Sequence, residues 1–323
     1  MLLLVGIANT AASAAELREG HFRIGVLVAV SPSTTPSMAA FVQELQKLGY
    51  VEGQNTVIDT RSAEGDPERL PALAKELAAL RPNVIFAIGT PPVMALKSSG
   101  TAIPVVFAGV GGDPVKSGLI NSLARPGGNL TGMLNVAIDI AGKRLQLLKE
   151  LLPAMARAGV LRNVGNEASV AIVDKILNSA SAVGIEVVPL DFRRVEDLPQ
   201  AVDRAEGLGA QALILTGDAV IVANRKAIID LANSRRLPTC FDYRFEVAEG
   251  GLMSYGANIE SNYRDAATYV DKILRGAKAA DLPVQQPTRT ENRRGSRHQS
   301  PASAVSAGRR SNRMIAVISM RRG

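Results

Sequence analysis

Residues able to recognise a small molecule follow a series of short apolar runs in this chain. Runs such as "FRIGVLVAV" and "PNVIFAIG" predict buried parallel strands. In open α/β sheets, ligands bind beyond the carboxyl ends of such strands. Hydroxyl, amide, carboxyl, aromatic and glycine residues occupy those positions here. The candidate ligand-binding residues are Ser31, Ser33, Thr34, Gly89, Thr90, Gly111, Asp113, Asn163, Asn166, Thr216, Asp218, Tyr243, Phe245 and Glu246.

These residue types indicate which ligand groups the site can bind. The loops "SPST" and "GTPP" place small hydroxyls before expected helices, where side-chain and backbone donors and the helix dipole favour a carboxylate. Asp218 can accept a hydrogen bond from a ligand amine. Tyr243 and Phe245 can stack on an aromatic or apolar ligand.

Structural interpretations of the same residues stay open. Asp113 precedes a proline and suits a helix N-cap, which we favour over ligand contact at that position. The hydroxyls of Ser31 to Thr34 can cap a helix as well as bind a ligand. Packing of Tyr243 and Phe245 on a neighbouring helix competes equally with stacking on a ligand.

The residue types give little support for catalysis or metal binding. A catalytic triad, a Cys-His pair or a His-rich zinc site would need His21 or His298, and neither histidine follows an expected strand. The glycine-rich "AGVGGDPV" lacks the G-x-G-x-x-G spacing and does not open a βαβ unit. We therefore expect no enzyme activity, no catalytic residue, no metal site and no cofactor.

Strand and helix signals alternate along the chain, which predicts an α/β fold. The alternation runs twice, so we expect two Rossmann-like lobes, each a short parallel sheet with helical crossovers. Lobe 1 is predicted to hold 22–130 and 257–288, and lobe 2 to hold 131–256. The expected helices include 113–123, 219–236 and a strongly amphipathic one at 260–276.

The stretch "RPGGNLTG" marks the first join between the lobes. Pro126 fixes φ, and two glycines supply backbone conformations with positive φ before an extended run. A second glycine-led extended run, 250–256, falls at the other join. We interpret both as hinge crossings, with a plain surface turn as the alternative for the first.

The two ends of the chain differ from its body. Residues 1–15 combine a short apolar core with "ASAA", which predicts a secretory signal peptide and export to the periplasm or another extracytoplasmic space. The net charge is +7, but residues 289–323 carry +8, so the body is near neutral and nucleic-acid binding is not expected. The composition of that Arg-rich tail predicts disorder.

Three motifs resemble a known family. "LQKLGYVEGQN", "SLARPGGNLTGM" and "RFEVAEGGLMSYGANIESNYRDAATYVDKILRG" closely resemble ABC transporter solute-binding proteins of the tryptophan/tyrosine type, over about residues 22 to 288. The resemblance implies the type I periplasmic binding-protein fold and a small solute held between two lobes. Asn163 and Asn166 match the family's Asn-x-x-Asn position, although Glu167 stands where the family usually has proline.

The resemblance also implies a function and partners. We expect a monomeric solute-binding component of an ABC importer, which captures an aromatic or another amino acid and delivers it to a membrane permease. A sensory domain of the same fold and an α/β enzyme are the alternatives.

The tail departs from the family pattern, which continues with a strand and a helix. Codons for 291–315 read one base later permit "KTAEALGINL", and the Met314-Ile315 junction then necessarily gives a stop. We therefore expect that a frameshift near residue 289 has removed the usual last strand and helix.

Overall fold

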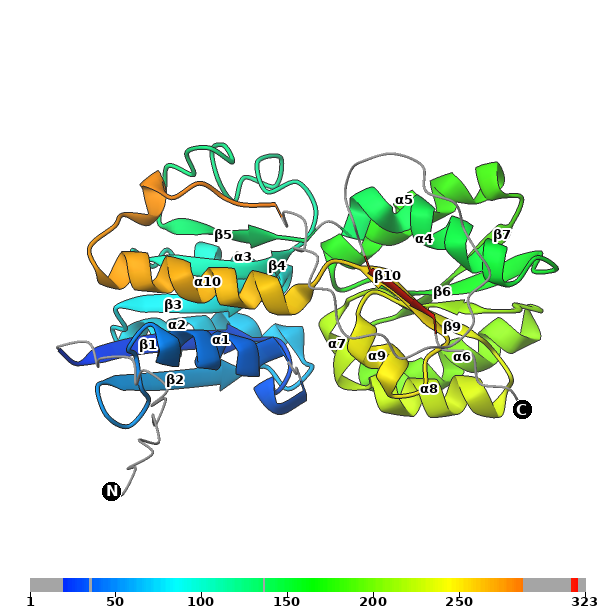
Figure 1. The fold of residues 1–323 in the computed structure, drawn as a ribbon, viewed down its shortest axis with the longest axis horizontal. Coiled ribbons are helices and arrows are strands. Elements are labelled where there is room, and N and C mark those ends of the chain that lie inside the picture. Colours follow the sequence, from blue (N-terminus) through cyan, green and yellow to red (C-terminus); the bar gives the residue numbers. More distant parts are fainter. Residues whose placement is uncertain (1–19, 35–36, 136, 287–314, 319–323) are drawn as a thin grey trace, which may run out of the picture.

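The computed structural model describes residues 20–34, 37–135, 137–286 and 315–318. Figure 1 shows two α/β lobes side by side along the long axis of the molecule, joined by short connecting segments. Each lobe contains its own parallel sheet with helices on both faces, as the alternation of signals in the sequence predicts.

The sheet of lobe 1 has five parallel strands in the order β2-β1-β3-β4-β5. Buried aliphatic residues of its strands pack against helices on each face, and the packing leaves two apolar clusters around one sheet. The strands are β1 (Phe22–Val28), β2 (Thr56–Ser62), β3 (Val84–Ile88), β4 (Val105–Val110) and β5 (Leu130–Leu134). The helices are α1 (Ser37–Lys47), α2 (Leu70–Ala79), α3 (Thr90–Ser98) and α10 (Ile259–Leu274).

The sheet of lobe 2 has the order β11-β10-β9-β8-β6-β7, with all neighbours parallel except β10 and β11. Its strands are β6 (Arg157–Asn163), β7 (Glu186–Phe192), β8 (Leu213–Ile214), β9 (Thr239–Phe241), β10 (Met253–Gly256) and β11 (Ile315–Ile318). Its helices are α4 (Ala137–Leu151), α5 (Glu167–Val183), α6 (Leu198–Gly207), α7 (Ala219–Ala223), α8 (Arg225–Ser234) and α9 (Arg244–Ala248).

The chain passes between the lobes where one sheet ends and an element of the other lobe begins. β5 belongs to the lobe 1 sheet and α4 packs on α5 in lobe 2, so the first crossing lies between Leu134 and Ala137. β10 belongs to the lobe 2 sheet and α10 packs on α1, which places the second crossing between Gly256 and Ile259.

The first crossing lies later than the sequence predicts. "RPGGNLTG" forms a turn, with Gly127 at φ 76°, and then enters β5 of the lobe 1 sheet. Gly132 has φ 150°, and a Cβ there would lie 2.0 Å from the Phe107 carbonyl oxygen. The glycines of this motif therefore permit a turn and a close strand approach within lobe 1. The predicted lobe boundary at residue 131 is wrong by the length of β5.

Two predicted helices also differ from the structure. Residues 113–123 form turns instead of a helix, and Gly118 at φ 69° ends the first of them. The predicted helix 219–236 is divided at Asn224 into α7 and α8.

Four residues of the C-terminal segment form a strand. Ile315–Ile318 pairs antiparallel with β10 at the edge of the lobe 2 sheet. The prediction of a disordered tail is therefore wrong for these four residues, because an apolar "IAVI" run can pair with an otherwise open strand edge. The predicted signal peptide and most of the tail lie outside the described residues.

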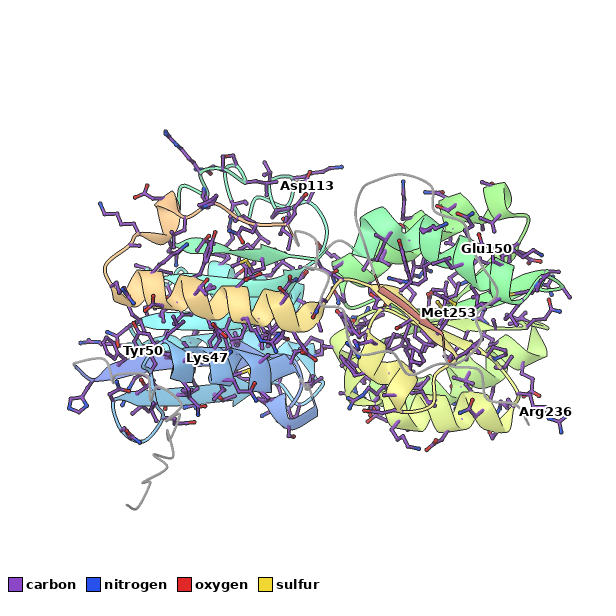
Figure 2. All side chains as sticks on the ribbon, viewed as in Figure 1. Lys47, Tyr50, Asp113, Glu150, Arg236 and Met253 are labelled. Atoms are coloured by element: carbon purple, nitrogen blue, oxygen red, sulfur yellow. The ribbon has the colours of Figure 1, made fainter. Side chains whose placement is uncertain are left out.

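Side chains divide between the outer surface of the lobes and their apolar interiors (Figure 2). In Figure 2, Lys47, Glu150 and Arg236 lie on the outside, whereas Met253 lies inside lobe 2, where it is 1% exposed. Among the described residues, no helix has both the length and the apolar composition needed to span a membrane.

Candidate functional site: the cleft between the lobes

A cleft with a cavity volume of about 120 Å³ lies between the two lobes. Its walls are formed where strands end: by the residues after β1, β3 and β4 in lobe 1, and after β6, β8 and β9 in lobe 2. This is the position at which parallel α/β sheets bind ligands. The size suits a small solute.

Most of the predicted ligand-binding residues line this cleft. They come from both lobes and from the ends of five strands, which the fold brings to one place. The predicted residues that line it are Gly89, Thr90, Gly111, Asn163, Asn166, Thr216, Asp218, Tyr243 and Phe245.

Five predicted residues remain, and the four whose side chains the structure describes lie outside the cleft lining. The hydroxyls of Ser31 and Ser33 lie 2.9 Å apart and hydrogen-bond each other. Asp113 is exposed, and its Oδ1 accepts from Val115 N and Lys116 N, as expected for a cap at the start of a turn. Glu246 is fully buried and accepts from the backbone N–H of Tyr243, the N-cap of α9. Thr34 ends a short 3₁₀ turn, and its side chain lies outside the described residues.

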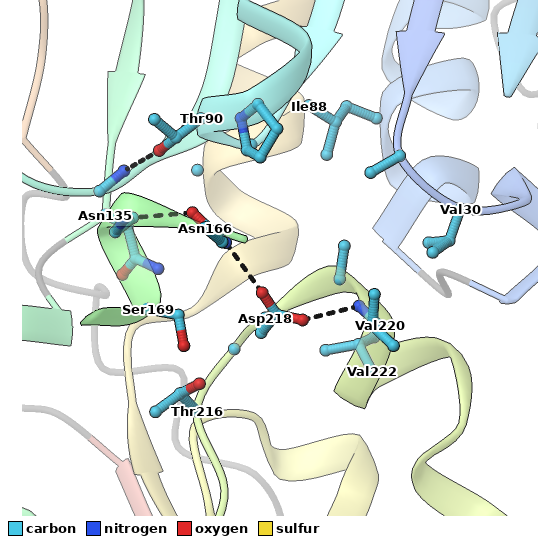
Figure 3. A pocket seen from close by; sticks show the side chains of 18 of the residues that line it. Val30, Ile88, Thr90, Asn135, Asn166, Ser169, Thr216, Asp218, Val220 and Val222 are labelled. Atoms are coloured by element: carbon cyan, nitrogen blue, oxygen red, sulfur yellow. Dashed lines mark hydrogen bonds between the residues drawn. The ribbon is translucent and has the colours of Figure 1, made fainter. Parts of the chain in front are cut away.

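Asp218 is the buried acid of the cleft. Its carboxylate accepts from Asn166 Nδ2 at 2.8 Å and from Val220 N at 2.9 Å (Figure 3). It also accepts from Asn163 Nδ2 at 3.1 Å. Burial raises the pKa of Asp218, while these hydrogen bonds oppose the shift by favouring the charged form. Within the described residues, no lysine or arginine forms an ion pair with it.

A buried ion pair supports the loop that carries Asp218. Arg144 of α4 pairs with Asp242, and both side chains are at most 2% exposed. Asp242 also accepts from Gly217 N at 2.8 Å, and Gly217 directly precedes Asp218. Arg144 Nε donates to the carbonyl of Tyr255 at 3.0 Å. The pair therefore connects the cleft loop with β10, close to the second crossing.

The rest of the cleft is largely apolar. In Figure 3, Val30 and Ile88 of lobe 1 lie on one side, and the polar group around Asp218 lies on the other. Tyr243 and Phe245 stack on each other with ring centroids 5.5 Å apart. A ligand with one charged end and one apolar end fits this division.

Several lining residues were not predicted from the sequence. Asn135 lies in the first crossing, and Ile259 and Tyr263 come from the first turns of α10. Ser37 and Met38 begin α1, while Ser169 and Ile172 belong to α5. The crossings themselves were a usable signal, because a segment that joins two lobes must pass beside the space between them.

Comparison with known proteins identifies the family of this chain. A family model described as "ABC transporter substrate binding protein" matches residues 23–292. The chain belongs to this family. It is 29% identical over 261 residues to a tyrosine-binding protein of Clostridioides difficile (strain R20291). The aligned region covers 80% of this chain and 74% of that protein. The family consists of solute-binding proteins that work with ABC permeases, rather than enzymes.

Two solved structures are similar to this chain over most of its length. A domain from Streptococcus pneumonia in complex with L-Trp is 25% identical, with a TM-score of 0.74, and covers 83% of this chain and 89% of its own. A ligand-free, open substrate-binding protein from Clostridium difficile is 28% identical, with a TM-score of 0.56, and covers 82% and 89%.

Proposed function

We propose that this protein captures a free amino acid with an aromatic or other apolar side chain and delivers it to an ABC permease. The observation that carries the proposal is Asp218, a buried carboxylate that lines the cleft and has no cationic partner among the described residues. A buried charge is stable only when it is paired or well hydrogen-bonded. An ammonium group of the solute would complete its partners.

The apolar lining supports the second part of the proposal. A polyol or sugar needs hydrogen-bond partners around its whole surface, because each unpaired polar group costs about 1–3 kcal/mol on burial. Here valine, isoleucine, proline and methionine residues make up much of the lobe 1 wall. An amino acid presents charged groups at one end and an apolar body at the other. The tyrosine and tryptophan bound by two relatives have this form.

The family relationship supports the cellular setting. We infer that the protein works outside the cytoplasm as a monomer, with a permease as its membrane partner and no nucleic acid. The apolar core and small residues at 1–15 support export. The near-neutral body supports the absence of a nucleic-acid partner.

A thermal-shift screen of the full chain tests the proposal. The solutes are L-tyrosine, L-tryptophan, L-phenylalanine, tyramine, 3-(4-hydroxyphenyl)propionate and myo-inositol. We expect the amino acids to raise Tm by several degrees, because they bind the folded state alone. The propionate, which lacks the amine, should have little effect. A rise with myo-inositol and none with any amino acid would refute the proposed solute class.

A further inference from the structure

The side-chain amide of Asn166 makes two hydrogen bonds in different directions. Its Nδ2 donates to Asp218 Oδ2 at 2.8 Å (Figure 3), and its Oδ1 accepts from Ala168 N at 3.1 Å. The second bond is the N-cap of α5, which continues for 17 residues from Glu167. One side chain therefore joins the acidic group of the cleft to the first turn of a long helix.

The first turn of α5 is also a point where lobe 1 meets lobe 2. A Cβ added to Gly111, in the loop after β4, would lie 3.0 Å from the Cβ of Ala168. Gly111 N donates to Thr90 Oγ1 at 3.1 Å, which holds this loop against the start of α3. Gly111 does not have a positive φ, so the missing side chain, and not backbone freedom, explains a glycine here. The lobes approach closely at this point because no Cβ intervenes.

We propose that Asn166 is a positioning residue that couples recognition of the solute at Asp218 to closure of lobe 1 on Ala168. The proposal rests on the proposed function. Asn166 orients the Asp218 carboxylate toward the cleft. It also fixes the first turn of α5, which Gly111 contacts at Ala168. Both polar atoms of its amide are thus engaged within the protein, which favours a supporting role over the direct ligand contact expected from the sequence.

Coupling of this kind links the affinity for the solute to closure of the lobes. With Asn166 present, one arrangement of the Asp218 carboxylate and the first turn of α5 both binds the ligand amine and contacts lobe 1. Solute binding then favours the closed arrangement by the difference in its affinity for the two arrangements. Without the Asn166–Asp218 bond, the carboxylate and the first turn of α5 would respond separately.

Two substitutions at residue 166 separate the two bonds. Asn166→Ser keeps an oxygen that can cap α5 but removes the donor to Asp218, whereas Asn166→Ala removes both. We expect Asn166→Ser to retain nearly the Tm of the unsubstituted protein and Asn166→Ala to lower it. This pair distinguishes loss of the coupling bond from loss of the helix cap.

The first arm of the test needs no solute. The groups acting on Asp218 are its burial and hydrogen bonds from Asn166, Asn163 and the backbone of Val220 and Ile221. Carbon-13 NMR of the Asp218 carboxyl in Asn166→Ser should therefore show titration at a higher pH than in the unsubstituted protein. An unchanged titration would overturn the positioning role, because a side chain that only caps α5 does not alter it.

The second arm measures coupling by calorimetry with L-tyrosine and L-tryptophan. Asn166→Ser should weaken binding about tenfold, the size expected for one charge-assisted hydrogen bond. In a Gly111→Val background, where closure is blocked, the same substitution should cost at most about threefold. Equal losses in both backgrounds would overturn the coupling. Gly128→Val is the matched control, because an added Cβ there meets no atom within 4 Å.

Failure of the proposed function has a separate signature. If the unsubstituted protein binds neither amino acid, the proposed solute class is wrong, while the carboxyl titration still decides whether Asn166 positions Asp218. If it binds them and Asn166→Ser binds them equally well, the solute class stands and the positioning role falls.

Discussion

Gly111 of lobe 1 and Ala168 of lobe 2 approach so closely that a Cβ on the glycine would lie 3.0 Å from the alanine Cβ. The contact joins a loop after β4 to the first turn of α5, beside the residues that line the cleft. In close-packed protein interiors and interfaces, even one added methyl group forces neighbouring atoms to move. The separation of the two lobes is therefore set in part by the absence of a side chain at residue 111.

Substitution of Gly111 by valine should hold the lobes apart without unfolding them. Small-angle scattering with saturating L-tyrosine should then show no compaction, and affinity should fall at least about tenfold. Tm without solute should stay close to that of the unsubstituted protein, since the added Cβ contacts only Ala168 of the opposite lobe. Compaction equal to that of the Gly128→Val control would show that this contact does not limit closure.

Replacing only one partner of the buried Arg144–Asp242 ion pair should lower the free energy of unfolding strongly. Arg144→Met leaves the Asp242 carboxylate buried and unpaired, at a cost of about 3–5 kcal/mol in the free energy of unfolding. Arg144→Met with Asp242→Asn should recover part of that loss, because no buried charge then remains. Urea denaturation measures both.

The solvent-exposed pair of Lys226 and Asp230 provides the comparison. Lys226→Met should change the free energy of unfolding by at most about 1 kcal/mol. If Arg144→Met costs no more than Lys226→Met, the buried pair does not support the cleft loop.

Glu246 should make stability depend on pH. Burial raises its pKa well above the usual value, so the folded protein favours the neutral acid. Its contribution to stability is therefore full below the pKa of the unfolded carboxyl, about 4.3, and is lost as pH rises through the raised folded value. Glu246→Gln should be more stable than the unsubstituted protein at pH 8 by about 1.4 kcal/mol for each unit of the shift, and should match it near pH 4.

Denaturation midpoints of both proteins from pH 4 to pH 8 check this expectation. The difference between them isolates residue 246 from the other buried acids. A difference that stays constant over the whole range would mean that Glu246 does not titrate in the folded protein as its burial requires.

Solute affinity should fall on acidification because of Asp218. Its carboxylate must be charged to hold an ammonium group, and burial raises its pKa from the ordinary aspartate value. Affinity for L-tyrosine should therefore be highest near neutral pH and decrease as pH falls through that raised value. Calorimetry at several pH values should show this acid limb in the unsubstituted protein and not in Asp218→Asn.

Much of the cleft could be predicted because strand ends in a parallel sheet share one edge. Thr216 and Asp218 follow β8, and Asn163 ends β6, so the order of strands alone brings them together. The predicted alternation likewise indicated two sheets and two joins. Here local sequence signals and the final fold agree, because each strand is a buried apolar run with a polar end.

The incorrect site predictions concern residues for which side-chain direction or packing determines whether the side chain reaches the cleft. Ser31 and Ser33 follow β1 as predicted, but their hydroxyls bond each other. Glu246 turns inward because it caps α9. Tyr263 reaches the cleft because α10 returns to lobe 1, where its ring packs edge-on against Phe86 at 5.6 Å. None of these directions is encoded in residue spacing along the chain.

If the charge of Asp218 selects for an amine on the solute, calorimetry with one pair of analogues will measure that selection. L-Tyrosine and 3-(4-hydroxyphenyl)propionate differ only in the amine, and Asp218→Asn keeps the shape of the side chain while removing its charge. We expect the unsubstituted protein to prefer L-tyrosine by at least about tenfold and Asp218→Asn to lose most of this preference. An equal preference in both proteins, or tighter binding of the propionate by the unsubstituted protein, would show that Asp218 does not recognise the amine.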